Sequence, residues 1–167
     1  MFGARQARVS LRHYTLGKQG ATAVAECLKE NDSIESLDLA DTWLEREGAT
    51  ALAEALEVNA TIQYLDVSHN RLGMDDGRGI GGIAISKALR SSQQLTDVCI
   101  SNNRLCDKVA EHISESLRKN ATLTRLDLSH NNIRDKVSDL PCNVRRGGRA
   151  IPCNWRAIPC NIRRKGV

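Results

Sequence analysis

The chain has 167 residues, enough for one domain with a buried core. Hydrophobic residues make up 41 % of it but aromatic residues only 3 %, so the core has to be built from aliphatic side chains. No apolar run approaches the roughly 18 residues of a membrane span, and the polar N-terminus has no signal-peptide core. We therefore expect no membrane partner and a cytoplasmic location.

The net charge of +4 hides an asymmetry along the chain. Residues 1–140 carry a net charge of −3, whereas residues 141–167 carry +7 and no acidic residue. The sequence therefore predicts a mildly acidic domain over 1–140 and a separate basic tail over 141–167.

The segment 1–140 contains a repeated block in which apolar residues alternate before a turn residue. A weak copy occupies 9–16, and clearer copies follow at 37–44, 65–72, 98–105 and 126–133. The blocks therefore recur at a constant period, except for one longer step between the third and the fourth. Alternation of this kind predicts a short strand in each block.

A helical pattern follows each of the first four blocks in constant register. One apolar ladder consists of Val24, Leu52, Ile85 and Ile113, and a second ladder, four positions later, consists of Leu28, Leu56, Leu89 and Leu117. Positions four apart share one face of a helix, which predicts four helices that bury this face. A single strand and helix cannot bury their own apolar surfaces, so stability has to come from stacked neighbours.

The pattern L-x-L-x-x-N-x-L-G-x-x-G-A-x-x-L-A-x-x-L, repeated at this period, resembles the ribonuclease-inhibitor type of leucine-rich repeat. Similar repeats occur in ribonuclease inhibitor, NOD-like receptors and Ran GTPase-activating protein. The resemblance covers about residues 6–140. It implies an α/β leucine-rich repeat solenoid, a horseshoe arc with parallel strands on the concave face and helices on the convex face. We expect four full coils and a partial fifth, at about 6–32, 33–60, 61–93, 94–121 and 122–140.

Several positions depart from this pattern. Tyr14 and Thr42 replace the turn asparagine, and Val109 and Val137 replace a repeat glycine. An insertion within 73–80 accounts for the longer step. Pro141 falls where the fifth helix should run, and proline inside a helix costs about 3 kcal/mol. We therefore expect at most a broken helix in the fifth coil.

The tail is of a different kind. Pro-Cys-Asn recurs at 141–143, 152–154 and 159–161, with no Cys-x-x-Cys pair and no nearby histidine to complete a metal site. Such biased composition predicts a disordered, low-complexity extension. The alternative is a basic, cysteine-containing segment that contacts nucleic acid weakly or binds acidic lipid.

Three patterns suggest chemistry but fit the repeat better. Residues 77–82 contain G-x-G-x-x-G, yet they begin well after the predicted strand that ends at Val67, whereas a dinucleotide site needs the first glycine directly after a strand. Ser, His and Asp stand side by side at 66–69 and 127–130, which does not build a converging triad. His13, His69 and His130 share one repeat position on non-adjacent coils, too far apart for one zinc ion. We expect no enzyme, catalytic residue, metal, cofactor or small-molecule substrate.

The outward strand positions form three predicted rows on the concave face. The first is Arg8, Ser36, Tyr64, Asp97 and Arg125; the second is Ser10, Asp38, Asp66, Cys99 and Asp127; the third is Arg12, Ala40, Ser68, Ser101 and Ser129. Trp43, Arg71 and Arg104 follow the turns. Tyrosine, tryptophan and arginine dominate protein-binding hot spots. The predicted partner-binding residues are Asp38, Trp43, Tyr64, Asp66, Arg71, Asp97, Arg104, Arg125 and Asp127.

The leading hypothesis is a scaffold that binds a partner protein through this face. One alternative is a GTPase-activating or other regulatory subunit on the same repeat, although no catalytic motif of that family matches here. Another is an uncapped fragment of a longer repeat protein with no function of its own, because terminal coils with bare apolar faces need caps.

Overall fold

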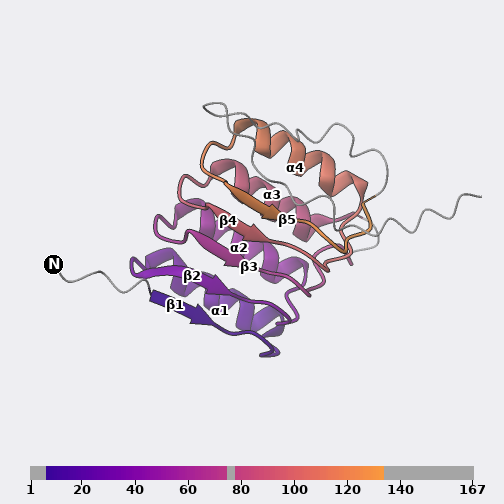
Figure 1. Cartoon of the computed structure of the whole chain (residues 1–167). Helices are drawn as coiled ribbons and strands as arrows, with labels where there is room; N and C mark the ends of the chain where they lie inside the picture. Colours follow the sequence, from indigo (N-terminus) through magenta and orange to yellow (C-terminus); the bar gives the residue numbers. More distant parts are fainter. Residues whose placement is uncertain (1–6, 75–77, 134–167) are drawn as a thin grey trace, which may run out of the picture.

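The computed structural model describes residues 7–74 and 78–133 (Figure 1). Strands and helices alternate along this part of the chain. They are β1 (Ala7–Ser10), α1 (Gly17–Glu30), β2 (Ile34–Asp38), α2 (Arg46–Val58), β3 (Tyr64–Asp66), α3 (Ile80–Ser91), β4 (Asp97–Cys99), α4 (Asp107–Lys119) and β5 (Arg125–Asp127).

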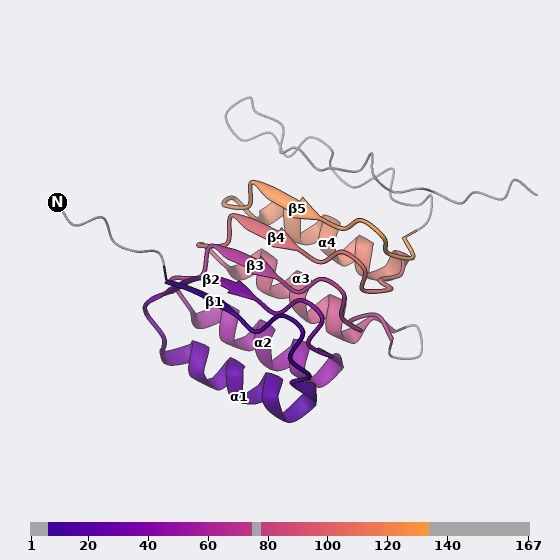
Figure 2. The same ribbon diagram turned by 60° about the horizontal axis from the view of Figure 1, so that its bottom comes forward.

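The strands form one parallel sheet in chain order, from β1 to β5. Each helix packs against the helix of the next coil, and the helices cover one side of the sheet (Figures 1 and 2). This is the predicted α/β solenoid with strands on one surface and helices on the other. We call the sheet surface turned away from the helices the concave face.

The register of the sheet follows the repeat spacing. Tyr64 pairs with Ser36 on one side and with Asp97 on the other, and Asp66 pairs with Asp38 and Cys99. The predicted alignment of equivalent strand positions is therefore confirmed, including the longer step across the insertion. The pairing is irregular only at Ala7 and Arg8 of β1.

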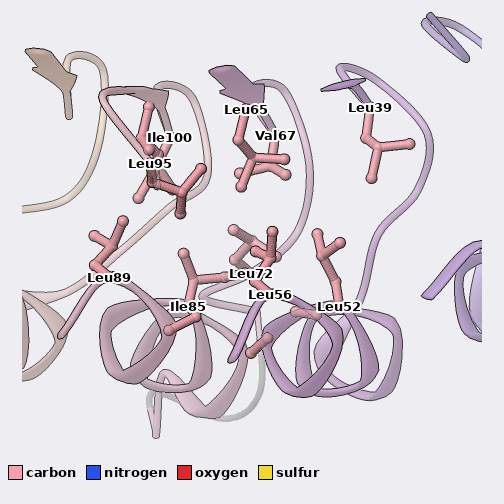
Figure 3. Close-up of a cluster of buried hydrophobic side chains, with 14 of the residues drawn as sticks. Leu39, Leu52, Leu56, Leu65, Val67, Leu72, Ile85, Leu89, Leu95 and Ile100 are labelled. Carbon is pink, nitrogen blue, oxygen red and sulfur yellow. The ribbon is translucent and has the colours of Figure 1, made fainter. Parts of the chain in front are cut away.

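The core lies between the sheet and the helices. Leucine, isoleucine and valine side chains point inward from the strands and meet the two predicted helix ladders (Figure 3). Leu52, Ile85, Leu56 and Leu89 are at most 2 % exposed, which confirms those ladders. Burial of one such side chain contributes about 1.5–3 kcal/mol. Val24 in the first coil is only partly buried, because no coil in the described part of the chain covers its outer side.

The turn asparagines connect neighbouring coils. The Asn70 amide nitrogen donates to the carbonyl of Leu39 in the preceding coil at 2.8 Å and to Val67 in its own coil at 3.0 Å. Asn103 is fully buried and repeats these bonds one coil later. These amide groups therefore provide hydrogen bonds to buried backbone carbonyls that the short strands leave without a donor. Thr42, which replaces an asparagine, donates its hydroxyl to the Leu39 carbonyl.

A second row of asparagines at the ends of the helices was not predicted. Asn59 and Asn120 donate to the carbonyls of Leu28 and Leu89 in the preceding coils and accept N–H groups that begin the next strand segment. Asn59 aligns with Asn31, and Asn120 with Ser92, one repeat period earlier. This repeated polar position could have predicted the second row.

The glycines around the insertion serve coil packing. A Cβ atom on Gly82 would lie 2.7 Å from a methyl group of Val109, and one on Gly81 would lie 3.0 Å from the Leu72 carbonyl oxygen. Gly79 has a positive φ of 67° directly before α3. These contacts account for Gly79, Gly81 and Gly82 without a nucleotide, and residues 75–77 lie outside the described part of the chain.

Within residues 7–74 and 78–133, no helix is both long and apolar enough to cross a membrane. The predicted basic tail, the broken fifth helix at Pro141 and the domain boundary at residue 140 all lie outside the described residues.

Candidate protein-binding surface

The nine predicted partner-binding residues fall into two groups in the structure. Six lie on strands of the concave face: Asp38, Tyr64, Asp66, Asp97, Arg125 and Asp127. The other three, Trp43, Arg71 and Arg104, lie in the turns after β2, β3 and β4, and we call them the strand-end row. The two groups differ in burial and in how their side chains are held.

Tyr64 is the exposed aromatic side chain of the concave face, with 38 % of its surface accessible. Partial burial raises the pKa of its phenol, and the nearby negative charges of Asp66 and Asp38 add to this shift. The phenol therefore stays protonated at neutral pH and can donate a hydrogen bond. Beside it, the Asp97 carboxylate pairs with the guanidinium of Arg125, whose side chain is 72 % exposed.

Arg12 spans the first part of the concave face, which sequence reasoning missed. Its Nε atom donates to Asp38 at 2.9 Å, and its terminal nitrogen donates to Asp66 at 2.8 Å. The hydrogen bond to Asp38 is the largest of the contributions that raise the pKa of Arg12, against a smaller opposing effect of burial. The sequence signal that could have predicted this contact was a long basic side chain in the third row, on the coil before those that carry the second-row residues Asp38 and Asp66.

The two aspartates that Arg12 binds are not equally accessible. Asp66 is 5 % exposed, and its other oxygen accepts the backbone N–H of Ser68. This buried carboxylate therefore connects the Arg12 side chain to the backbone that follows β3. Asp38 is half-buried. Burial by itself raises the pKa of Asp38, but the backbone N–H of Ala40 and the Arg12 guanidinium lower it more, so the pKa lies below its ordinary value.

The other end of the second row holds Cys99 and Asp127. The Cys99 thiol donates to the Asp127 carboxylate at 3.7 Å. Burial raises the pKa of Cys99, partly offset by hydrogen bonds with Ser101, and the charges of Asp66 and Asp127 raise it further. The thiol is therefore protonated at neutral pH. Within the described residues, no cation forms an ion pair with Asp127.

The third predicted row is exposed only in part. Ala40, Ser68 and Ser101 are at most 7 % exposed and lie just past the ends of their strands, whereas Arg12 is exposed and Ser129 is partly exposed. The accessible concave face is therefore narrower than three full rows.

In the strand-end row, the Arg71 guanidinium lies over the Trp43 ring at 4.1 Å from its centre. A carboxylate oxygen of Glu45 lies 3.6 Å from a terminal nitrogen of the same guanidinium. Trp43 is 45 % exposed, and Arg104 is exposed. Both Trp43 and Arg104 have positive φ angles, of 60° and 56°, a conformation uncommon for large side chains.

The residues considered for catalysis and metal binding have other roles. His13 lies 2.9 Å from Asp41, and His69 lies 3.3 Å from the amide of Asn102. Asp66 binds Ser68 and Arg12. All of residues 13, 41, 69, 102 and 130 have positive φ, which marks a turn position of the repeat. In the part of the chain that the structure describes, no three His, Cys, Asp or Glu side chains could together hold a metal ion.

Comparison with known proteins agrees with this architecture. The family model described as leucine-rich repeat matches residues 30–53, 58–85 and 119–136. No curated protein sequence matches the chain. A solved structure titled leiomodin-1 actin-binding site 2 is 26 % identical, covers 77 % of this chain and 70 % of its own, and has a TM-score of 0.64. The tropomodulin C-terminal domain from Caenorhabditis elegans is 20 % identical, with coverages of 75 % and 74 % and a TM-score of 0.63. The chain carries leucine-rich repeats and has the leucine-rich repeat solenoid fold.

Proposed function

We propose that this chain is a non-enzymatic scaffold that binds a partner protein through its concave face, in the cytoplasm. The observation that carries the proposal is the exposed Tyr64 between β2 and β4, flanked by the solvent-facing Arg125 and its partner Asp97. A partly desolvated aromatic ring surrounded by charged groups is the usual composition of a binding hot spot. The ion pair between Arg12 and the buried Asp66 links the segment after β1 to the end of β3 beside Tyr64.

The leiomodin-1 structure is actin-binding site 2 of that protein, and the chain is similar to it over 77 % of its length. Actin is therefore the first partner to test. We also infer that the coils are of the ribonuclease-inhibitor type and that the repeat domain spans 1–140, with the tail at 141–167 as a separate segment. The regular period of the blocks and the helix that follows each of the first four strands support these assignments.

The experiment measures binding of purified actin to the immobilised full chain and compares three variants. Tyr64→Ala and Arg125→Glu change the concave face, whereas Val58→Ala changes an exposed apolar residue at the end of α2. We expect the first two to weaken binding at least about tenfold and the third to leave it unchanged. Full affinity in the Tyr64 variant would overturn the concave face as the binding surface. Absence of binding to the unmodified chain would remove actin as the partner.

A further inference from the structure

We propose that the strand-end row of Trp43, Arg71 and Arg104 is a second contact surface, which binds a protein segment with an apolar side chain followed by carboxylates. The three residues occupy one repeat position on consecutive coils. This inference deepens the proposed function and rests on it, because it names the chemistry of a partner segment.

The backbone of Trp43 is held in place by the next coil. The Asn70 side-chain oxygen accepts the N–H groups of Thr42 at 3.1 Å and of Leu44 at 2.9 Å. Trp43, between these two donors, has a φ of 60°. A bulky residue adopts this conformation only where its surroundings impose it, and such residues cluster at binding sites. Asn70 therefore fixes the direction in which the indole leaves the turn.

The same arrangement recurs at the other end of the row. The Asn131 side-chain oxygen accepts the N–H groups of Asn103 at 2.9 Å and of Leu105 at 3.0 Å, and Arg104 between them has a φ of 56°. A Cβ atom on Gly73 would collide with the carbonyl oxygen of Arg104, so this turn packs closely on the preceding coil. Both ends of the row are therefore held by side-chain hydrogen bonds from the next coil.

Three of the large exposed apolar side chains lie in equivalent segments of neighbouring coils. The large exposed apolar side chains among the described residues are Tyr14, Trp43, Val58, Tyr64 and Met74. Three of these, Tyr14, Trp43 and Met74, lie in the segments that follow β1, β2 and β3. An aromatic ring with this exposure is suited to an apolar side chain of a partner.

Among the charged side chains at this edge, one arginine is available to pair with a carboxylate of the partner. Asp41 lies against His13, and Glu45 against Arg71. Arg104 is exposed and forms no ion pair within residues 7–74 and 78–133. A guanidinium binds a carboxylate through two parallel hydrogen bonds, so an acidic segment complements this edge.

The spacing of the coils sets the spacing of the segment. Neighbouring strands lie about 4.8 Å apart, which places Arg71 and Arg104 about 5 and 10 Å from Trp43 along the row. Extended chain advances about 3.3 Å per residue and its side chains alternate between two faces, so an acidic residue two positions after an apolar one lies on the same face about 7 Å away. The long guanidinium side chain of Arg104 can cover the remaining distance. The probe is the synthetic peptide acetyl-Gly-Phe-Gly-Glu-Glu-Gly-amide.

The experiment titrates this peptide into the full chain carrying Trp155→Phe, which leaves Trp43 as the only tryptophan. We expect a saturable change in Trp43 fluorescence, and an affinity at least about tenfold lower in Arg104→Ala. Arg118→Ala removes an equal charge from the exposed side of α4 and is expected to leave the affinity unchanged. A peptide with lysines in place of the glutamates is expected not to bind.

No saturable change with the glutamate peptide, equal affinity of Arg104→Ala, or equal binding of the lysine peptide would each overturn the inference. Failure here is distinguishable from failure of the proposed function. If the peptide does not bind while Tyr64→Ala still abolishes actin binding, the concave face stands and the strand-end row does not. If the peptide binds while Tyr64→Ala leaves actin binding intact, the strand-end row stands and the concave face does not.

Discussion

The guanidinium of Arg12 binds the carboxylate of Asp66 at 2.8 Å, although the two residues are 54 positions apart in the sequence. Arg12 follows β1 and Asp66 ends β3, so this ion pair spans three strands of the sheet and passes over Asp38 of β2. The first coil has a neighbour on one side only within the described residues. Arg12 therefore adds a polar attachment where apolar stacking is least complete.

Replacing Arg12 with methionine should lower the free energy of unfolding by about 1–2 kcal/mol. Methionine keeps much of the apolar stem but leaves the buried Asp66 carboxylate without its cationic partner, and an unpaired buried polar group is costly. Urea unfolding followed by circular dichroism measures the change. Arg8→Met, on the same face and without an ion pair in the described part of the chain, is the matched control. Equal loss in both variants would show that Arg12 contributes only general charge.

Asp38 should make part of the stability depend on pH. Its pKa is lowered in the folded state because the Ala40 N–H and Arg12 outweigh the opposing effect of burial. A carboxyl with a lowered folded pKa stabilises fully above its unfolded pKa of about 3.9, and this contribution is lost as the pH falls through the folded value. Asp38→Asn should therefore flatten the decline in unfolding free energy below about pH 4. Asp32→Asn, which removes one carboxyl at an exposed turn position, is the matched control.

The repeat spacing predicted the fold because each coil needs the same residues at the same positions. Leu37, Leu65 and Leu126 are buried where the alternation placed them, and Leu52 of α2 and Ile85 of α3 are buried at equivalent helix positions as predicted. Stacking couples these positions across coils, so one repeated pattern specifies pairing, register and core together.

The surface was less predictable because its contacts depend on side-chain reach. Arg12 was assigned only to an outward row, and its bonds to Asp38 and Asp66 follow from a long side chain crossing two coils. Ala40 and Ser68 share that row's spacing, yet they are buried just past the ends of β2 and β3. The positive φ of Trp43 depends on an asparagine in the next coil, which its local sequence does not encode.

Gly82 and Val109 should show a strong energetic coupling. A methyl group on Gly82 would lie 2.7 Å from a Val109 methyl carbon, closer than van der Waals contact allows. Gly82→Ala should therefore destabilise by about 1–2 kcal/mol despite its better helix propensity. In the Val109→Ala background the Val109 contact is removed but the contact with a Leu105 methyl carbon at 2.8 Å remains, so the same change should cost less than in the unmodified chain. A double-mutant cycle from urea unfolding measures the coupling, and simple additivity of the two changes would contradict this packing.

Asn70→Ala should release Trp43 from its turn and destabilise the arc. The variant loses the oxygen that accepts the N–H groups of Thr42 and Leu44, and it leaves the Leu39 carbonyl without its amide donor. Several buried bonds are lost together, so the free energy of unfolding should fall by about 2–4 kcal/mol. In the Trp155→Phe background, the Trp43 fluorescence anisotropy should also fall. The reason is that the Asn70 side chain no longer holds the backbone on either side of Trp43, so the indole can rotate more freely. Asn132→Ala, at an exposed position near β5, is the control and should change neither quantity. Unchanged anisotropy in a folded Asn70 variant would mean that the Arg71 stack alone orients the ring, since that contact at 4.1 Å does not involve the Asn70 amide.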